Sequence, residues 1–248
     1  MHIIIPARYA STRLPGKPLA DVAGKSLLQR VYERAREADA TSVVIATDDE
    51  RIRTAAQGFG AHVCMTRAEH RSGTERLAEV IQKLSIGDAE IVVNLQGDEP
   101  LMPPALMRQV AERLASQHDA AVATACHPIS NRDEFTNPNV VKVVVDERGY
   151  ALFFSRAPIP WPRDVMAGQA QRPLQAHRHI GLYAYRAGFV RRYAAWPACA
   201  LEETEQLEQL RVLWHGERIA VCEATESPGP GVDTPEDLQR VRAIFARG

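Results

Sequence analysis

The sequence lacks the features that mark secreted, membrane-spanning and metal-stapled proteins. Its four cysteines include no C-x-x-C pair and no metal-ligand spacing, which favours buried thiols in a reducing compartment. No apolar run approaches the roughly 20 residues that cross a bilayer. A strand pattern begins at residue 2, so we expect no signal peptide. These absences predict a cytoplasmic protein with no membrane partner.

The chain also has no excess of either charge. Its formal net charge is −1 over 248 residues, so no overall field attracts nucleic acid or an anionic membrane. No basic patch interleaved with aromatic residues indicates nucleic-acid binding. The phosphate-loop motif G-x-x-x-x-G-K-[ST], the dinucleotide motif G-x-G-x-x-G and the G-x-S-x-G elbow are missing too. Any site for an anion must therefore be built from local cations.

Strand and helix patterns alternate along the first half of the chain. Predicted strands fall at residues 2–6, 42–47, 61–65, 90–95 and 120–126, and predicted helices at 26–38, 49–59, 74–84 and 103–116. The strands are apolar throughout rather than alternating, as is typical of strands buried on both faces. This order predicts an α/β fold, with a mainly parallel, doubly wound central sheet and helices on both faces.

The pattern changes after residue 127. Residues 140–145 and 150–154 form a predicted hairpin, residues 157–173 a loop, and residues 180–185 another strand. Predicted helices near 187–195 and 203–214, a strand at 218–222 and a helix from Thr234 complete the chain. We therefore expect one domain of 248 residues with a β-rich insertion at about 127–186.

A cationic loop follows the first predicted strand. Arg8, Arg13 and Lys17 lie within ten residues of each other in a segment that contains Gly16. A loop after a parallel strand lies at the carboxyl edge of the sheet, where open α/β folds bind ligands. Backbone N–H groups and fixed cations in such a loop can hold a phosphate chain. An ordinary basic surface loop is the alternative.

Two acidic residues suit a divalent cation. Asp98 follows a predicted central strand and Gly97, and Mg²⁺ commonly takes one or two carboxylates together with phosphate oxygens. Asp233 comes from a Gly-rich turn in which Thr234 can already cap the last helix. The alternatives are a turn Asp98 that caps the next helix and an Asp233 that favours the helix dipole. Glu99 is expected to be a helper of the site or a structural partner.

Three further polar stretches are candidate contact sites. Residues 70–76 offer hydroxyls and free N–H groups at a helix start, although an ordinary helix cap fits equally. Arg156, His179 and Tyr183 suit a carboxylate and hydroxyls, whereas a His177-x-His179 zinc site lacks further spaced ligands. The stretch 202–211 is either a polar contact surface or a solvated helix face.

Together these segments resemble the 3-deoxy-manno-octulosonate cytidylyltransferases, also called CMP-KDO synthetases. The resemblance covers essentially the whole chain, and only the 163–176 stretch matches the family poorly. Seven motifs occur in the family's order, at residues 5–19, 70–76, 93–100, 154–160, 179–186, 205–211 and 231–238.

The resemblance implies a Rossmann-like nucleotidyltransferase fold, usually a homodimer. It implies that CTP and the acid sugar KDO react to give CMP-KDO and pyrophosphate, for lipopolysaccharide synthesis, with Mg²⁺ as cofactor. The insertion is then expected to bind the sugar and to form the dimer.

The resemblance also assigns residues to roles. The metal ligands are Asp98 and Asp233, which act in catalysis with Arg8, Arg13 and Lys17. The nucleotide-binding residues are Ala7, Arg8, Ser11, Lys17, Ser72, Gly73, Thr74, Arg76, Gln96 and Asp98. The sugar-binding residues are Arg13, Gln96, Arg156, His179, Tyr183, Glu208 and Gln209, with Arg156 expected on the sugar carboxylate because a planar guanidinium matches that group.

Two other functions fit the same residues. One is a cytidylyltransferase for another 2-keto acid sugar, such as a sialic acid. The other is a regulator that binds CTP without releasing pyrophosphate. Intact Lys17, Asp98 and Asp233 argue against the regulator.

Overall fold

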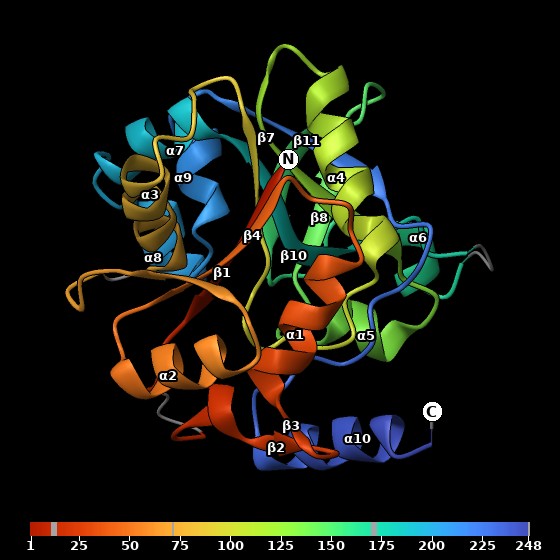
Figure 1. Ribbon diagram of the computed structural model, residues 1–248. Helices are drawn as coiled ribbons and strands as arrows, with labels where there is room; N and C mark the ends of the chain where they lie inside the picture. The colour runs from red at the N-terminus through yellow and green to blue at the C-terminus, as the bar shows by residue number, and fades with distance from the viewer. Residues whose placement is uncertain (11–13, 71, 170–172, 248) are drawn as a thin grey trace.

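A mixed, mostly parallel sheet forms the centre of the protein in the computed structural model, which describes residues 1–10, 14–70, 72–169 and 173–247 (Figure 1). The strands are β1 (His2–Ala7), β2 (Asp21–Val22), β3 (Lys25–Ser26), β4 (Ser42–Thr47), β5 (His62–Met65), β6 (Ile91–Asn94), β7 (Ala120–Pro128), β8 (Lys142–Val145), β9 (Ala151–Ser155), β10 (His177–Arg186) and β11 (Arg218–Glu223). The helices are α1 (Leu27–Arg36), α2 (Glu50–Gly58), α3 (Gly73–Lys83), α4 (Pro104–Ser116), α5 (Arg132–Thr136), α6 (Arg163–Met166), α7 (Ala187–Ala194), α8 (Ala200–Glu205), α9 (Gln209–Trp214) and α10 (Pro235–Phe245), with the 3₁₀ turn η1 (Lys17–Leu19).

The strand order of the central sheet is β11-β7-β10-β6-β1-β4-β5. Strands β6, β1, β4 and β5 pair in parallel, as do β11 and β7. Strand β10 runs antiparallel between β6 and β7. The predicted α/β fold with a mainly parallel sheet is thus confirmed.

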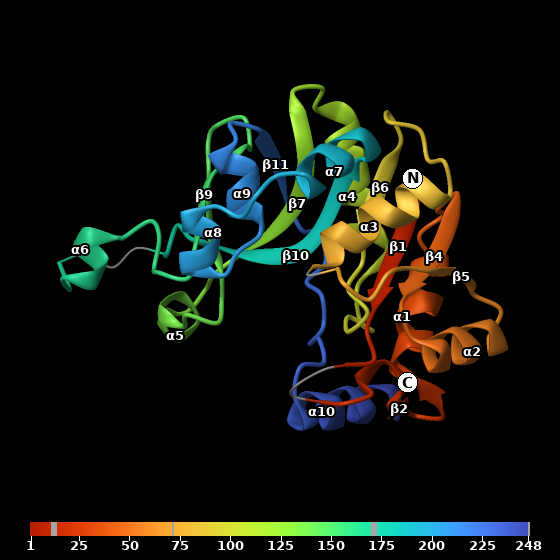
Figure 2. The same cartoon turned by 90° about the vertical axis from the view of Figure 1, so that its left-hand side faces the viewer.

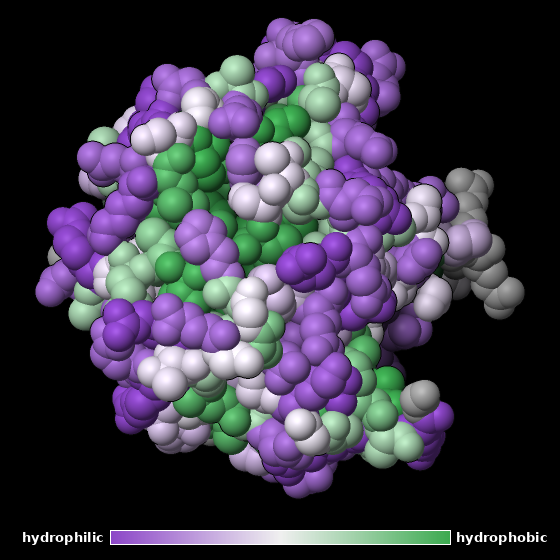
Figure 3. All heavy atoms as spheres, viewed as in Figure 1, coloured by the Kyte–Doolittle hydropathy of each residue, from purple (hydrophilic) through white to green (hydrophobic). Residues whose placement is uncertain are grey.

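Helices cover both faces of this sheet, which explains the continuous apolar strands. On β1, Ile3 and Ile5 pack into one core with α1 and α4, whereas Ile4 packs into the other with α3, α7 and α9. Figure 1 shows these two helical layers on either side of the strands. Hydrophilic residues cover much of the face shown in Figure 3, with hydrophobic side chains near its middle. In the described part of the chain, no helix is long and apolar enough to cross a membrane.

Within the predicted insertion, β10 belongs to the centre of the sheet. The β8–β9 hairpin joins the same sheet at its margin, where β8 pairs with β9 and with the first residues of β10, and α5 and α6 lie beside it. Figure 2 shows α5 and α6 at one end of the molecule, remote from α2 and β5. The predicted loop at 157–173 contains the short helix α6.

The predicted helix at 203–214 is broken into α8 and α9. Gln206 lies between them in the left-handed region, at φ 54°. The break turns Glu208 and Gln209 toward the edge of the sheet, where both line a pocket.

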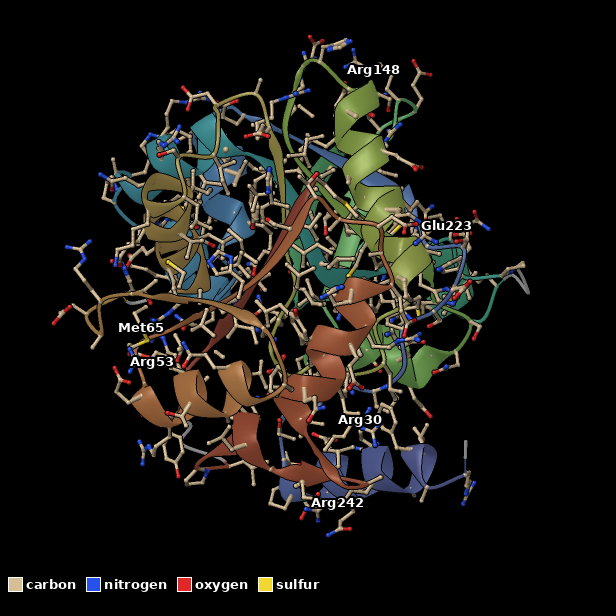
Figure 4. The ribbon with its side chains drawn as sticks, in the orientation of Figure 1. Arg30, Arg53, Met65, Arg148, Glu223 and Arg242 are labelled. Atoms are coloured by element: carbon tan, nitrogen blue, oxygen red, sulfur yellow. The ribbon has the colours of Figure 1, made fainter. Side chains whose placement is uncertain are left out.

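The last helix, α10, returns to the start of the chain. Arg242 Nε donates to the Asp21 carbonyl at 2.8 Å, and the Arg30 guanidinium lies 4.6 Å from the Phe245 ring centre. Figure 4 shows Arg30 and Arg242 at this junction of α10 with β2. The docking fixes the segment that carries Asp233 beside the loop that carries Lys17.

Candidate active site

Lys17, Asp98 and Asp233 meet at the carboxyl edge of the sheet. Lys17 Nζ lies 2.7 Å from Asp98 Oδ2, 3.4 Å from Asp233 Oδ1 and 2.9 Å from the Val232 carbonyl oxygen. The Val232 N–H donates to the Asp98 carbonyl at 2.9 Å, which ties the two acidic segments together. Three segments that are distant in sequence thus form one charged cluster.

Local structure explains why these side chains converge. Gly16 takes φ 70° and precedes η1, so the chain turns sharply at Lys17. Gly97 lies so close to the first strand that a Cβ there would be 2.9 Å from the Pro6 carbonyl oxygen. A side chain at Gly97 would push Asp98 away from Lys17.

The structure addresses the helix-end alternatives for the two aspartates. Pro103, and not Asp98, precedes α4, and that helix start has no side-chain cap. Thr234 caps α10 in a capping box with Asp237. Asp98 is therefore not used as a helix cap, whereas Asp233 directly precedes the capped start of α10, where a favourable interaction with the helix dipole stays open.

The acidic cluster suits a divalent cation that also binds a phosphate. Burial, and after it the charges of Asp98 and Asp233, raise the pKa of Glu99 to about 8, so the two aspartates add a negative charge that a cation would offset. No three His, Cys, Asp or Glu side chains gather as a metal cage within the described ranges. Two carboxylates with room for phosphate oxygens match the binding mode of Mg²⁺ rather than a site built from protein ligands alone.

Two adjoining pockets open beside this cluster. The first, of about 340 Å³, is lined by Pro6, Ala7, Arg8, Ala10, Lys17, Pro18, Ser72, Gly73, Gln96, Gly97, Asp98 and Glu208. The second, of about 360 Å³, is lined by Gly73, Thr74, Asn94, Gln96, Val122, His179, Gly181, Tyr183, Tyr185, Tyr193, Gln206, Leu207, Glu208, Gln209 and Val212. We call them the cationic pocket and the aromatic pocket. Gly73, Gln96 and Glu208 line both, so two ligands could meet there.

The side chains of the aromatic pocket are mostly neutral hydrogen-bonding groups. Burial lowers the pKa of His179 to about 3, so its ring is uncharged at neutral pH. The Thr124 hydroxyl donates to the Leu182 carbonyl at 2.8 Å, so His179 Nε2, 3.0 Å away, carries the proton and donates to that hydroxyl. Burial also raises the pKa of Glu208, which accepts a hydrogen bond from Thr74 at 3.1 Å. Such a pocket suits a ligand with several hydroxyl groups.

Arg8 is held in the cationic pocket by the neighbouring loop. Its guanidinium donates to the His70 carbonyl, and the His70 ring lies 2.5 Å from a Glu79 carboxylate oxygen. Ser72 caps α3 by accepting from the Glu75 N–H, so the helix-cap interpretation of residues 70–76 is confirmed for that residue. The cap leaves the hydroxyl proton of Ser72 free to donate.

Two predicted contact residues are directed elsewhere. Arg76 is fully buried, donates to the Thr66 hydroxyl and pairs with Asp48 at 3.3 Å. Arg156 donates to the Glu205 and Pro138 carbonyls. Neither of them lines either pocket. The predicted residues Ser11 and Arg13 lie outside the described part of the chain.

The solvated-face alternative for residues 202–211 holds only in part, because Glu203, Thr204 and Gln206 are exposed. Glu202 and Gln209 are buried, and Arg211 binds both carboxylate oxygens of Glu202. The sequence analysis missed Asn94, Tyr185 and Tyr193, which line the aromatic pocket. The one available signal was Asn94, a polar residue that ends an otherwise apolar strand.

Known proteins match this chain along its whole length. A family model described as "Cytidylyltransferase" matches residues 2–219. A 3-deoxy-manno-octulosonate cytidylyltransferase from Vibrio parahaemolyticus serotype O3:K6 is 59% identical over 248 residues, which is 99% of this chain and 98% of the relative. The chain belongs to the 3-deoxy-manno-octulosonate cytidylyltransferase family. A member from Idiomarina loihiensis is 55% identical over 99% of this chain and 98% of its own length.

Solved structures agree with the cytidylyltransferase family. The structure of CMP:2-keto-3-deoxy-manno-octonic acid synthetase complexed with CTP has a TM-score of 0.90 and 46% identity, over 99% of this chain and 98% of that one. A cytidylyltransferase from Leptospira borgpetersenii, at 18% identity and a TM-score of 0.65 over 99% of this chain and 86% of that one, shares the fold.

Glu79 predicts an acid-sensitive contribution to stability. Burial raises its pKa, but hydrogen bonds from the Arg67 N–H, from Lys83 and from the His70 ring outweigh burial and lower the pKa to about 2. Because this value lies below the unfolded value of 4.5, ionised Glu79 stabilises the fold above about pH 4.5, and the stabilisation is lost as the pH falls toward 2. Glu79→Gln is expected to lower the free energy of unfolding by about 1–2 kcal/mol at pH 7, since solvent screens part of these interactions.

Urea denaturation from pH 7 to pH 3 tests this expectation. The difference between wild type and Glu79→Gln should shrink below pH 4.5. Glu50→Gln is the matched control, since the Glu50 side chain is 64% exposed and pairs with Arg53 on its own helix. A difference that stays constant over this pH range would contradict the prediction.

Proposed function

We propose that this protein transfers CMP from CTP to the 2-hydroxyl of KDO, releasing pyrophosphate and supplying CMP-KDO for lipopolysaccharide synthesis. Membership of the 3-deoxy-manno-octulosonate cytidylyltransferase family supports this reaction. The observation that carries it is the meeting of Lys17, Asp98 and Asp233 beside two adjoining pockets. One pocket offers cations for a triphosphate and the other offers hydrogen-bonding groups for a sugar.

The cationic pocket is proposed to bind CTP. Arg8 and Lys17 offset the charge of the triphosphate, while Ser72, Gly73 and Thr74 present hydroxyl and N–H groups at the start of α3. Ala7 and Gln96 complete the wall of the pocket. Ser11 and Arg13 are proposed to contact the substrates from the same loop.

The aromatic pocket is proposed to bind KDO. Gln96, His179, Tyr183, Glu208 and Gln209 line it and can hydrogen-bond a carboxylate and several hydroxyls. Since Arg156 donates to backbone carbonyls, its proposed contact with the sugar carboxylate requires rearrangement of that side chain.

The reaction is a phosphoryl-type transfer. The KDO 2-hydroxyl oxygen forms a bond to the α-phosphorus of CTP as the bond to the bridging oxygen of pyrophosphate breaks, and the hydroxyl proton is released. The protein acts mainly by holding the two substrates in line and by stabilising charge. Asp98 and Asp233 would hold Mg²⁺, which when bound neutralises phosphate charge and favours ionisation of a nearby hydroxyl. Lys17 adds a fixed positive charge at the same place.

We also propose that the protein is a homodimer and that the β8–β9 hairpin region forms the contact. Leu152 and Trp161 are 60% and 58% exposed there, and exposed apolar groups of this size favour association. Light scattering is expected to give twice the chain mass of 27.5 kDa, and Leu152→Asp with Trp161→Glu to give the monomer. Retention of the dimer by this double variant would exclude the hairpin region as the contact.

A pyrophosphate-release assay tests the proposed reaction. We expect release only when CTP, KDO and Mg²⁺ are all present. Equal or better turnover of N-acetylneuraminate would favour the related sialic acid reaction. CTP binding in calorimetry without pyrophosphate release from any acid sugar would favour the regulator.

A further inference from the structure

Asn94 is a buried polar side chain that the proposed contacts do not use. It ends β6 and lies opposite Tyr183 on β10. The residue is 2% exposed and lines the aromatic pocket. Its Oδ1 atom is buried and has no hydrogen-bond partner within the described residues.

The surroundings of Asn94 explain which of its atoms is available. The Tyr185 hydroxyl lies near Thr74 and Asn94, and both interact with it electrostatically. Because Oδ1 has no partner, the amide nitrogen is the atom that we place toward Tyr185. Turning the amide by 180° would exchange the two atoms, so one polar atom of Asn94 lacks a protein partner in either orientation.

Leaving such an atom unpaired is costly. A buried polar group without a hydrogen bond destabilises a fold by about 1–3 kcal/mol. Val122 and Val212, which also line the pocket, offer the amide no hydrogen bond. Within the described residues no protein atom pairs with Oδ1, and a hydroxyl of a molecule in the pocket would pair with it once the amide turns toward the pocket.

We propose that Asn94 is a specificity-determining residue that hydrogen-bonds one hydroxyl of the acid sugar beyond its reacting carbon. This inference rests on the proposed function, because the sugar must occupy the aromatic pocket. A site built around a hydrogen bond to a hydroxyl discriminates strongly against an analogue that lacks it, since the buried partner is then left unpaired. Asn94 thus selects among sugars by their hydroxyl pattern, while the charged cluster acts on the phosphate.

Steady-state kinetics with KDO and its 4-, 5-, 7- and 8-deoxy analogues test the proposal. Wild type should lose about 10- to 100-fold in kcat/KM on one analogue, equivalent to one hydrogen bond to a buried group. For Asn94→Leu, kcat/KM on KDO should fall below the wild-type value by a similar factor. The kcat/KM of this variant on that same analogue should equal its kcat/KM on KDO. Its thermal stability should equal or exceed that of the wild type, because the unpaired amide has been removed.

Several results would overturn the proposal. One is that wild type turns over KDO and all deoxy analogues equally well. A second is that Asn94→Leu turns over KDO as fast as wild type does. A third is that this variant loses the same factor, relative to wild type, on KDO and on every analogue. Asn94→Ala, which removes the amide from a smaller side chain, provides the same comparison if the leucine variant does not fold. Failure of wild type to release pyrophosphate with KDO would overturn the proposed function, and the Asn94 inference with it. Normal KDO turnover without the analogue-specific loss would overturn only the inference.

Discussion

Asp98→Asn is expected to lower kcat for pyrophosphate release by about 100- to 1,000-fold. The substitution preserves the size of the side chain but removes the charge that faces Lys17 Nζ at 2.7 Å. It also removes one of the two carboxylates proposed to hold Mg²⁺. The affinity for CTP in the absence of Mg²⁺, measured by calorimetry, should change little, because loss of an acidic group does not weaken the attraction for a polyanion.

The matched control is Asp119→Asn. Asp119 is also paired with a cation, Arg218, at 3.0 Å, but its side chain is 72% exposed and lines neither pocket. The kcat of Asp119→Asn should remain within twofold of the wild-type value. A reduction of less than fivefold for Asp98→Asn would contradict the assignment of Asp98 to the reaction.

The sequence was sufficient to predict the central sheet and to place the loops after β1 and β6 at the same edge of it. Continuous apolar strands require cover on both faces, and parallel strands deliver the loops that follow them to one edge. For this reason the cationic loop after β1 and Asp98 after β6 could be expected at the same place. The position of Asp233 was less certain, because it depends on the docking of α10 against β2 through Arg242.

The position of β10 could not be predicted from the local pattern. An apolar segment indicates a buried strand but does not identify its neighbours, and β10 inserts antiparallel between β6 and β7. The break at Gln206 was equally hidden, because glutamine is a good helix former. Packing of Leu207 and Leu210 into the core shared by α3 and α7 accompanies the left-handed turn there.

The roles of individual arginines were the least predictable part of the site. A basic residue in a helix-start motif fits a phosphate contact and a buried ion pair equally well. Arg76 belongs to the second kind, since it is fully buried and pairs with Asp48. Only the tertiary structure, which brings Asp48 at the end of β4 against α3, separates the two possibilities.

Lys17→Met is the second substitution with a large expected effect. Lys17 pairs with Asp98 at 2.7 Å and lines the cationic pocket with a side chain only 14% exposed. Its loss should reduce kcat/KM for CTP by about 100- to 1,000-fold, because a fixed charge in a site shielded from water is worth far more than one in bulk solvent. Lys25→Met is the matched control, since Lys25 is 41% exposed and pairs with Glu33.

Lys17→Met should also change the affinity of the nucleotide-free protein for Mg²⁺. This measurement separates an effect of the lost charge from a general structural effect. In the nucleotide-free protein the ammonium neutralises Asp98 and Asp233, so it competes with a divalent cation for the same carboxylates. Without it, Mg²⁺ binding in the absence of CTP should tighten by about tenfold in calorimetry. Weaker turnover together with tighter Mg²⁺ binding would mean that Lys17 exchanges the carboxylates for the triphosphate when CTP enters. Weaker turnover with unchanged Mg²⁺ binding would contradict that exchange, since the two aspartates would then not share their charge with Lys17.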